Sequence, residues 1–235
     1  MIRLTLLKKN KFLISTLILS IMISLLLSLS DDDKKNKKIY IDSYIVNPSG
    51  YPELGKWMIN ERYEPANWLD HKLDGKLIQE PINIVIIDYV SRSSGEAVKR
   101  LLEACKRSGF QIYGGHSAEY MGYIAGTFYN QLPEGFGKAF SDSKFNSNND
   151  HGRIFGPCLY NSVYYFTGAF SREDFIKGAH GYDSFIKARE VFAKAMDKRS
   201  GYQIKGKVNL DNKLINDPVF TSGDHDGQAA VLVIK

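Results

Sequence analysis

The chain has 235 residues, of which 43% are hydrophobic and 12% aromatic, enough for one sizeable globular core. A formal net charge of +5 invites a nucleic-acid interpretation, but the charge is concentrated in the first 38 residues. These hold eight of the 31 lysines and arginines and three of the 26 acidic residues, so 23 of each remain. The rest of the chain is formally neutral, and we predict no nucleic-acid partner.

The N-terminus combines a cationic run, residues 1–11, with an uncharged apolar stretch of 18 residues, 12–29. This stretch is near the length of a membrane-spanning helix, and the lysines before it would stay in the cytoplasm. Two interpretations are open: an anchor, giving a single-pass plasma-membrane protein, or a signal peptide cleaved near Ser30, giving a secreted one. Residues 30–38 are predicted to be a charged linker, and 39–235 an extracytoplasmic domain.

The first part of this domain, residues 39–75, carries weak signals. Ile39–Ile41 and Tyr44–Val46 are candidate short strands. The remainder is rich in proline and asparagine, which predicts irregular structure. Trp57 and Trp68 are expected to pack this segment onto the domain.

A strand, a helix and a second strand are predicted next. Ile82–Ile87 is apolar and β-branched, as in a buried strand. Apolar residues then recur at helical spacing from Glu96 to Ser108, and Gly109 ends the helix. Phe110–Tyr113 predicts another strand, so the order favours a β-α-β opening of an α/β layer.

Further elements follow along the chain. Glu119–Tyr129 is expected to form a short helix, and Leu132–Asn149, rich in glycine, serine and asparagine, a surface loop. Asp183–Lys198 is amphipathic and predicts a long helix. Three segments predict strands from their apolar, β-branched and aromatic residues: Ser162–Phe170, Tyr202–Leu210 and Ala229–Ile234. The elements together predict a single α/β domain, with α+β as the alternative, in which two helices flank a mixed sheet.

The strongest functional signal is polar. His151 and Arg153 alternate in an extended segment, so both side chains are expected on one face. His180 and Asp183 follow about one strand later. If all four converge, an arginine fork, two imidazoles and a helix N-terminus would suit a phosphate or carboxylate.

Catalytic and architectural roles are both open for these residues. In catalysis, His151 or His180 would be the general acid or nucleophile, Asp183 would orient an imidazole, and Arg153 would stabilise charge. In the architectural alternative, Arg153 and Asp183 form an ion pair, Asp183 or Ser184 caps the helix, and the histidines are satisfied hydrogen-bonding groups. Whether the chain is an enzyme is left open.

No metal or cofactor is predicted. His151, His180 and His225 with nearby aspartates would suit zinc, but no local pair has the spacing of a known metal motif. Cys105 falls inside a predicted helix and Cys158 follows a Gly-Pro turn, without the spacing of a disulfide framework. A disulfide between them is left open.

Several short motifs occur in a recognisable order over about residues 80–235: Pro81-Ile82-Asn83-Ile84-Val85, Ser108-Gly109-Phe110, His151-Gly152-Arg153-Ile154-Phe155, Gly168-Ala169-Phe170-Ser171, His180-Gly181-Tyr182-Asp183 with Arg189, and Asp226-Gly227. This order resembles the LssY C-terminal domain family, usually seen attached to membrane-embedded proteins of the lipid-phosphatase type. The family usually has a second histidine where this chain has Asp150. The resemblance implies a membrane setting and adds Arg189 to Arg153 as a ligand-binding candidate.

The site and the resemblance together give the functional expectation. We expect a membrane-tethered, LssY-C-like module that binds an anionic or polar envelope ligand, such as a small molecule, a lipid headgroup or a saccharide phosphate. One alternative is a hydrolase of phosphate or other esters that uses His151, Arg153, His180 and Asp183. A second is a structural partner of a membrane protein, without a small ligand.

Overall fold

The computed structural model describes residues 43–115, 119–144, 146–177 and 180–235. Tyr44–Lys235 form one compact unit. The predicted membrane segment, 12–29, and the candidate strand Ile39–Ile41 lie outside the described residues. Within the part that the structure describes, no helix is both long and apolar enough to cross a membrane.

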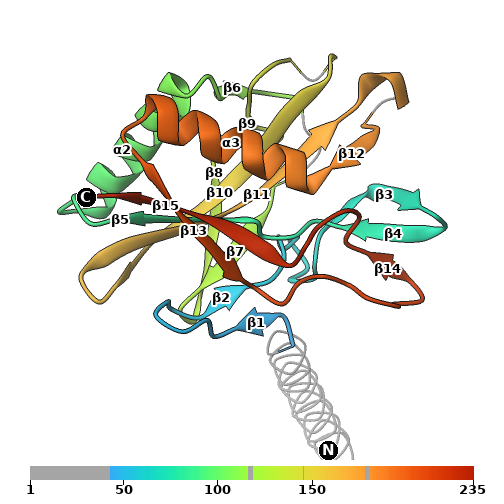
Figure 1. The fold of residues 1–235 in the computed structure, drawn as a ribbon, viewed down its shortest axis with the longest axis horizontal. Helices are drawn as coiled ribbons and strands as arrows, with labels where there is room; N and C mark the ends of the chain where they lie inside the picture. Colours follow the sequence, from blue (N-terminus) through green and yellow to red (C-terminus); the bar gives the residue numbers. More distant parts are fainter. Residues whose placement is uncertain (1–42, 116–118, 145, 178–179) are drawn as a thin grey trace, which may run out of the picture. The chain divides into compact units, whose positions relative to one another are not determined.

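Most of the described chain forms one curled, mixed sheet (Figure 1). Its strands are β1 (Ile45–Val46), β2 (Leu54–Gly55), β5 (Ile84–Asp88), β6 (Gln111–Tyr113), β7 (Met121–Ile124), β8 (Thr127–Leu132), β9 (Ala139–Ser141), β10 (Asn149–Tyr160), β11 (Val163–Glu173), β12 (Tyr182–Ser184), β13 (Gln203–Asn209) and β15 (Gln228–Ile234). The main order is β1-β2-β7-β8-β10-β11-β5-β15-β13, with β12 on β11, β9 on β10 and β6 on β9. A smaller sheet has the order β14-β4-β3, from β3 (Asn67–Leu73), β4 (Lys76–Gln79) and β14 (Phe220–Thr221).

Two α-helices, α2 (Ser94–Arg107) and α3 (Phe185–Arg199), and a short 3₁₀ helix, η1 (Phe175–Lys177), complete the described elements. Ser93 begins α2 by accepting a hydrogen bond from the Glu96 N–H, and Ser184 does the same for α3 with the Lys187 N–H. These caps satisfy N–H groups that have no partner inside a helix. The helices predicted at Glu96–Ser108 and Asp183–Lys198 are confirmed, as is the cap at Ser184.

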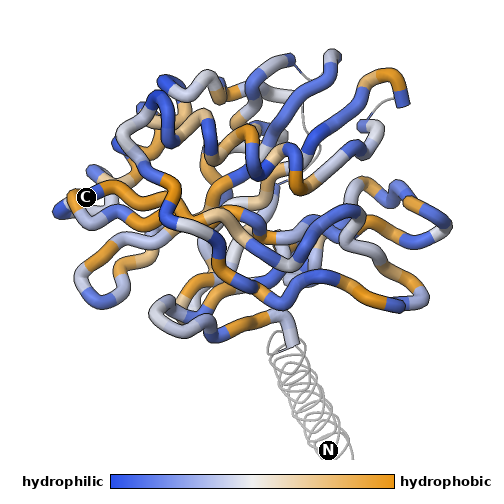
Figure 2. The backbone as a smooth tube through the Cα atoms, in the orientation of Figure 1, coloured by the Kyte–Doolittle hydropathy of each residue, from blue (hydrophilic) through white to orange (hydrophobic). Residues whose placement is uncertain are grey.

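The long sheet has an apolar layer on each face. Helices α2 and α3 cover one face, where they pack on alternate strand residues such as Ile84, Phe166 and Leu232. The intervening residues, such as Val85, pack on the opposite face beneath the segment that contains β1 and β2. Figure 2 shows β15 as a nearly continuous hydrophobic strand, as burial on both faces requires. The predicted mixed sheet with two flanking helices is confirmed.

The predicted β-α-β arrangement is wrong in its pairing. The strand at Gln111–Tyr113 exists, but it pairs antiparallel with β9. The parallel neighbour of β5 is β15, from the end of the chain. Gln111 and Ile112 are exposed, whereas a central parallel strand must be apolar on both sides. The Ala229–Val233 segment meets that requirement and β6 does not.

The prediction of a helix at Glu119–Tyr129 is also wrong. The segment forms the hairpin of β7 and β8. Ala125 and Gly126 at its tip have φ of 48° and 83°, and two residues with positive φ make the tight turn that suits strand twist. The predicted loop at 132–149 contains one buried strand, β9, which the burial of Phe140 holds in the core.

The N-terminal part of the domain is more regular than predicted. It contains β1, β2 and the hairpin of β3 and β4, and both tryptophans, Trp57 and Trp68, are buried as expected. Cys105 and Cys158 are free thiols buried in the layers on opposite faces of the sheet, so no disulfide joins them.

Candidate functional site

A polar stripe crosses β10 and β11 on the face opposite the helices. Asn149 pairs with Glu173 and His151 with Ser171, and Arg153 follows two residues later along β10. Because side chains alternate along a strand, these residues share one face of the sheet. All five are at least 95% buried. Such a group is unusual, because charged residues are rarely buried unless they are paired.

Glycine separates the histidine and the arginine for a steric reason. A Cβ atom at Gly152 would lie 2.4 Å from the Ala169 carbonyl oxygen and 2.5 Å from the Phe170 ring. Phe170 stacks on Phe192 of α3, with ring centroids 3.9 Å apart. The close approach of this aromatic layer therefore requires glycine at position 152.

Three of the four predicted residues meet at one small cavity. His151, Arg153 and His180 line a space of about 20 Å³. Its other walls come from Trp68, Leu69, Glu80, Tyr120 and Glu173. This volume suits about one water molecule or the tip of a small polar group.

Arg153 is the most unusual member of this cavity. Its side chain is buried, and its guanidinium carbon lies 4.6 Å from the centroid of the Tyr120 ring. Within the described part of the chain, Nε has no hydrogen-bond partner and the guanidinium forms no ion pair. Burial lowers the pKa of Arg153, and Glu80, Tyr120 and Glu173 oppose that change. A buried charge without a partner is costly.

Glu80 adds a group that can titrate near neutral pH. Burial raises the pKa of its carboxyl to about 7, with Arg153 opposing and Glu173 adding to this rise. The Glu80 side chain can therefore donate a hydrogen bond when protonated or accept one when ionised. A carboxyl with such a pKa is the kind of group found in acid-base and ligand sites.

Glu173, in contrast, is well satisfied. Its Oε1 atom lies 3.0 Å from Nδ1 of His180, and its Oε2 atom accepts a hydrogen bond from Nδ2 of Asn149 at 3.1 Å. Trp68 donates from Nε1 to the backbone carbonyl of His180 at 2.7 Å. These contacts fix the position of His180 at the rim of the cavity.

His151 sits between an amide and a hydroxyl. Its Nδ1 atom lies 2.8 Å from Oδ1 of Asn149. Because Nδ2 of Asn149 donates to Glu173, Oδ1 must accept, so Nδ1 of His151 carries the proton. Its Nε2 atom then faces the Ser171 hydroxyl at 3.5 Å and the Glu173 carboxylate at 4.0 Å. Asn149, His151 and Ser171 thus follow the order of an orienting group, a base and a nucleophile.

Asp183 does not join the other three predicted residues. Its carboxylate forms ion pairs with Lys177 at 3.1 Å and Lys187 at 3.0 Å. These lysines hold its pKa below the usual value despite partial burial. Asp183 therefore does not line the cavity, and in the described structure it forms no ion pair with Arg153.

Arg189 does not line the cavity either, and its contacts are with other residues. Its guanidinium donates two hydrogen bonds to Asp226, at 2.6 and 3.0 Å, and one to the carbonyl of Gln228 at 2.7 Å. The arginine thus ties α3 to the start of β15. Asp150, on the other face of β10 from His151, binds Arg172 in the same bidentate way.

Sequence reasoning missed Glu80, Glu173 and Tyr120 at this site. Glu80 directly precedes the apolar run that begins at Pro81, and Glu173 continues the alternation of Ser171 along β11. A search for charged residues that extend a strand pattern would have found Glu173. Nothing in the sequence around Tyr120 indicates its place.

The described residues contain no group of three or more histidine, cysteine, aspartate or glutamate side chains that could hold a metal ion. Comparisons of the chain with protein-family models, curated proteins and solved structures give no match. The geometry of the cavity is therefore the basis for a functional interpretation.

Proposed function

We propose that this chain is a membrane-tethered α/β domain that binds a small anionic group, a phosphate or a carboxylate, at Arg153. The observation that carries the proposal is the buried guanidinium of Arg153, whose Nε lacks a hydrogen-bond partner in the described structure. An oxyanion that accepts from a guanidinium forms short, charge-assisted hydrogen bonds. Binding would thus supply the partner that folding does not.

Two neighbouring groups support the proposal. Glu80 can donate a hydrogen bond to the anion when its carboxyl is protonated, and its pKa of about 7 allows this near neutral pH. His180 presents its imidazole at the rim, where its side chain is 28% exposed. Glu173 is held by His180 and Asn149 and forms no hydrogen bond to Arg153 in the described structure, so the guanidinium stays available to the anion.

The cavity is open on the side of Leu69, which is 38% exposed. Leu69 and Asp70 have φ of 48° and 60°, a conformation that costs free energy for residues other than glycine. We propose that this segment of β3 shifts when the ligand enters. A space of about 20 Å³ takes only part of a phosphate without such a shift.

The class and setting of the chain are part of the proposal. The parallel pairing of β5 and β15, with α2 and α3 on one face, supports the α/β class. The apolar residues 12–29 and the cations before them support a plasma-membrane tether with the domain outside, and cleavage near Ser30 is the alternative. The resemblance to the LssY C-terminal domain family supports the same setting, in which a ligand of the cell envelope would be bound.

Calorimetric titration of the detergent-solubilised full chain with inorganic phosphate and with acetate tests the proposal. We expect Arg153→Met to weaken binding of the preferred anion by about 10-fold to 100-fold, the value of a charge-assisted hydrogen bond. Arg172→Met is the matched control, because Arg172 lies on the opposite face of the sheet. Equal affinity of wild type and Arg153→Met would reject the proposal, and so would a lack of binding by either anion.

Hydrolysis of phosphate or other esters is a second candidate, favoured by the chain of contacts from Asn149 through His151 to Ser171. Ser171 Oγ would bond to the ester carbon or phosphorus while its proton passes to His151 Nε2. The alcohol would leave with that proton, and water would then hydrolyse the ester formed on Ser171. Arg153 would stabilise the charge that develops on the substrate oxygen.

A fluorophosphonate reagent and p-nitrophenyl esters test this second candidate. The hydrolase hypothesis expects the reagent to label Ser171, and it expects Ser171→Ala to abolish both labelling and turnover. Ser141→Ala is the control, because Ser141 is equally buried on β9 but hydrogen bonds only to backbone carbonyls. Turnover that survives in Ser171→Ala would exclude the serine mechanism.

A further inference from the structure

Tyr120 lines the small cavity that contains Arg153 and also lines two larger hollows. One hollow has a volume of about 490 Å³ and the other about 480 Å³. Both are lined by Glu61, Glu119 and Tyr120, and the second also shares Leu69 with the cavity. Volumes of this size are typical of small-molecule sites.

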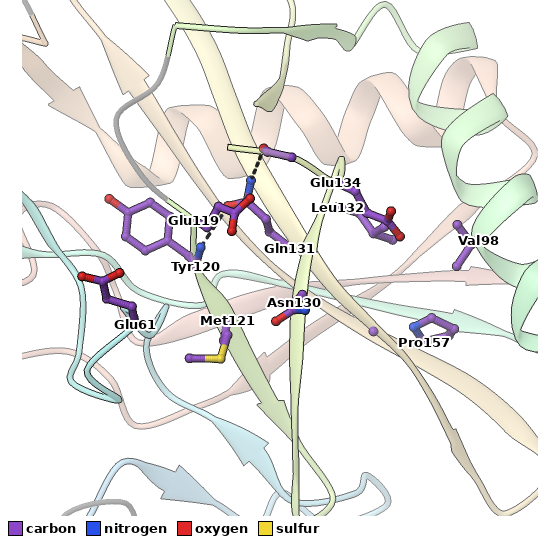
Figure 3. Close-up of a pocket in the computed structure, with 12 residues that line it drawn as sticks. Glu61, Val98, Glu119, Tyr120, Met121, Asn130, Gln131, Leu132, Glu134 and Pro157 are labelled. Atoms are coloured by element: carbon purple, nitrogen blue, oxygen red, sulfur yellow. Dashed lines mark hydrogen bonds between the residues drawn. The ribbon is translucent and has the colours of Figure 1, made fainter. Parts of the chain in front are cut away.

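The first hollow has an apolar base and an acidic border. Figure 3 shows its lining, in which Val98 comes from α2, Pro157 from β10 and Met121 from β7. Its charged lining residues are all acidic: Glu61, Glu119 and Glu134. None of these three carboxylates forms an ion pair with any residue that the structure describes.

The second hollow repeats this charge pattern. It adds Glu64 and Asp70 to the shared acids and contains a single cation, Arg62. Both hollows that border Tyr120 are therefore lined by several carboxylates. They repel a ligand that is purely anionic and attract a positive group.

We infer that the ligand is a zwitterion. Its phosphate or carboxylate binds at Arg153, and its ammonium group lies next to Tyr120 in the first hollow, which Glu61, Glu119 and Glu134 line. This inference rests on the proposed function, since Arg153 must hold the anionic end. Tyr120 connects the two parts of this site, because the guanidinium of Arg153 lies over its ring and the unpaired acids line the hollow beside it. An ammonium group there also gains from the aromatic face and the amide oxygen of Asn130.

The charge balance favours this ligand over a plain phosphate ester. Water and salt screen the carboxylates at this exposed border, so their combined attraction for an ammonium group is modest. We expect a preference of about fivefold to tenfold for the ester that carries the ammonium group, which is about 1–1.4 kcal/mol.

Two phosphate monoesters that differ only by an ammonium group measure its contribution. We would titrate the full chain with 2-aminoethyl phosphate and with ethyl phosphate and expect the first to bind about fivefold to tenfold more tightly. The variant with Glu61→Gln, Glu119→Gln and Glu134→Gln should bind both esters equally, and its affinity for ethyl phosphate should exceed that of the wild type because the repelling carboxylates are gone. Glu103→Gln, an exposed acid of α2 outside the hollow, should leave the preference intact.

The outcomes separate this inference from the proposed function. Equal binding of both esters by the wild type, with loss of both in Arg153→Met, would overturn the zwitterion and leave anion binding intact. Absence of binding by every anion would overturn both. Glycerophosphoethanolamine, a phosphodiester, distinguishes the two sources of the ligand: tighter binding than 2-aminoethyl phosphate assigns the site to a lipid headgroup, and weaker binding assigns it to a free phosphate.

Discussion

The carboxyl of Glu80 and the guanidinium of Arg153 line one buried cavity, yet within the described structure they form no ion pair with each other. They interact only through their charges, and each shifts the other's pKa against the effect of burial. Arg189, also buried, binds Asp226 through two hydrogen bonds. Of these two buried arginines, Arg189 forms a structural ion pair, and Arg153 is buried without one among the described residues.

These two arginines should respond in opposite ways to replacement by methionine. Arg153→Met removes a desolvated charge and keeps most of the volume, so we expect unchanged or higher stability. Arg189→Met leaves Asp226 without its partner and should lower the free energy of unfolding by about 2–4 kcal/mol. Urea unfolding of both variants makes the comparison. A large loss of stability in Arg153→Met would mean that this arginine is structural.

Glu80 should make the protein less stable at high pH. Its pKa is about 7 in the folded protein and 4.5 without burial, so the folded state holds the proton over that interval. Its contribution to stability is complete below about 4.5 and is lost as pH rises through 7. We expect Glu80→Gln to be more stable than wild type at pH 8, by up to about 3 kcal/mol, and equal to it near pH 4.5.

Unfolding of wild type and Glu80→Gln at both pH values measures this effect. Glu64→Gln is the control, since Glu64 is exposed. The same titration predicts that anion binding weakens as pH rises through 7, because ionised Glu80 repels the ligand, and that Glu80→Gln removes this dependence. A pH profile of stability that is identical in wild type and Glu80→Gln would show that Glu80 titrates normally.

The parts of the fold that could be predicted are those encoded by local patterns. The two helices, β5, and the shared face of His151 and Arg153 follow from the spacing of residues along one element. The partner of β5 could not be predicted in this way, because β15 lies far along the chain and pairing depends on which strand is apolar on both faces. The hairpin at Ala125 was missed because its turn depends on two residues with positive φ.

Only some residues of the candidate site could be predicted from the sequence. His151 and Arg153 were placed by alternation, but Glu80 reaches the cavity only through the tertiary arrangement of the sheet. Asp183 was expected at the site because it precedes a helix. Lys177 and Lys187 hold it elsewhere. The i,i+4 spacing of Asp183 and Lys187 indicates one of these ion pairs, whereas the contact with Lys177 depends on the fold.

Gly152 should tolerate no side chain. A Cβ there would meet the Ala169 backbone and the Phe170 ring at 2.4 and 2.5 Å, so Gly152→Ala should cost about 1–3 kcal/mol or more. Gly95→Ala is the matched control, because nothing lies within 4 Å of its Cβ position in α2 and alanine favours a helix by about 1 kcal/mol. Thermal unfolding should move in opposite directions in the two variants; similar shifts would contradict the packing of Phe170 on β10.

His225 should give the protein a sensitivity to acid. Its Nε2 atom lies 2.8 Å from Oδ1 of Asn212, whose Nδ2 donates to two backbone carbonyls. Nε2 therefore carries the proton, and Nδ1 is buried without a partner among the described residues. Burial lowers the pKa from 6.5 to about 4; Asp226 and Asp224 oppose this change, whereas Arg189 and Lys213 add to it.

As pH falls, His225 takes up its proton near pH 6.5 in the unfolded state but only near pH 4 in the folded state. The stability due to neutral His225 is therefore complete above pH 6.5. It falls by up to about 3 kcal/mol as pH drops to 4. Glu80 acts with the opposite sign in an overlapping interval, so the two contributions partly cancel in the wild type.

We expect Glu80→Gln to show a steeper loss of stability between pH 6.5 and 4, and the further change His225→Gln to flatten it. Replacing the exposed His71 instead should leave the slope unchanged, and a slope that survives in His225→Gln would assign the acid sensitivity to another group.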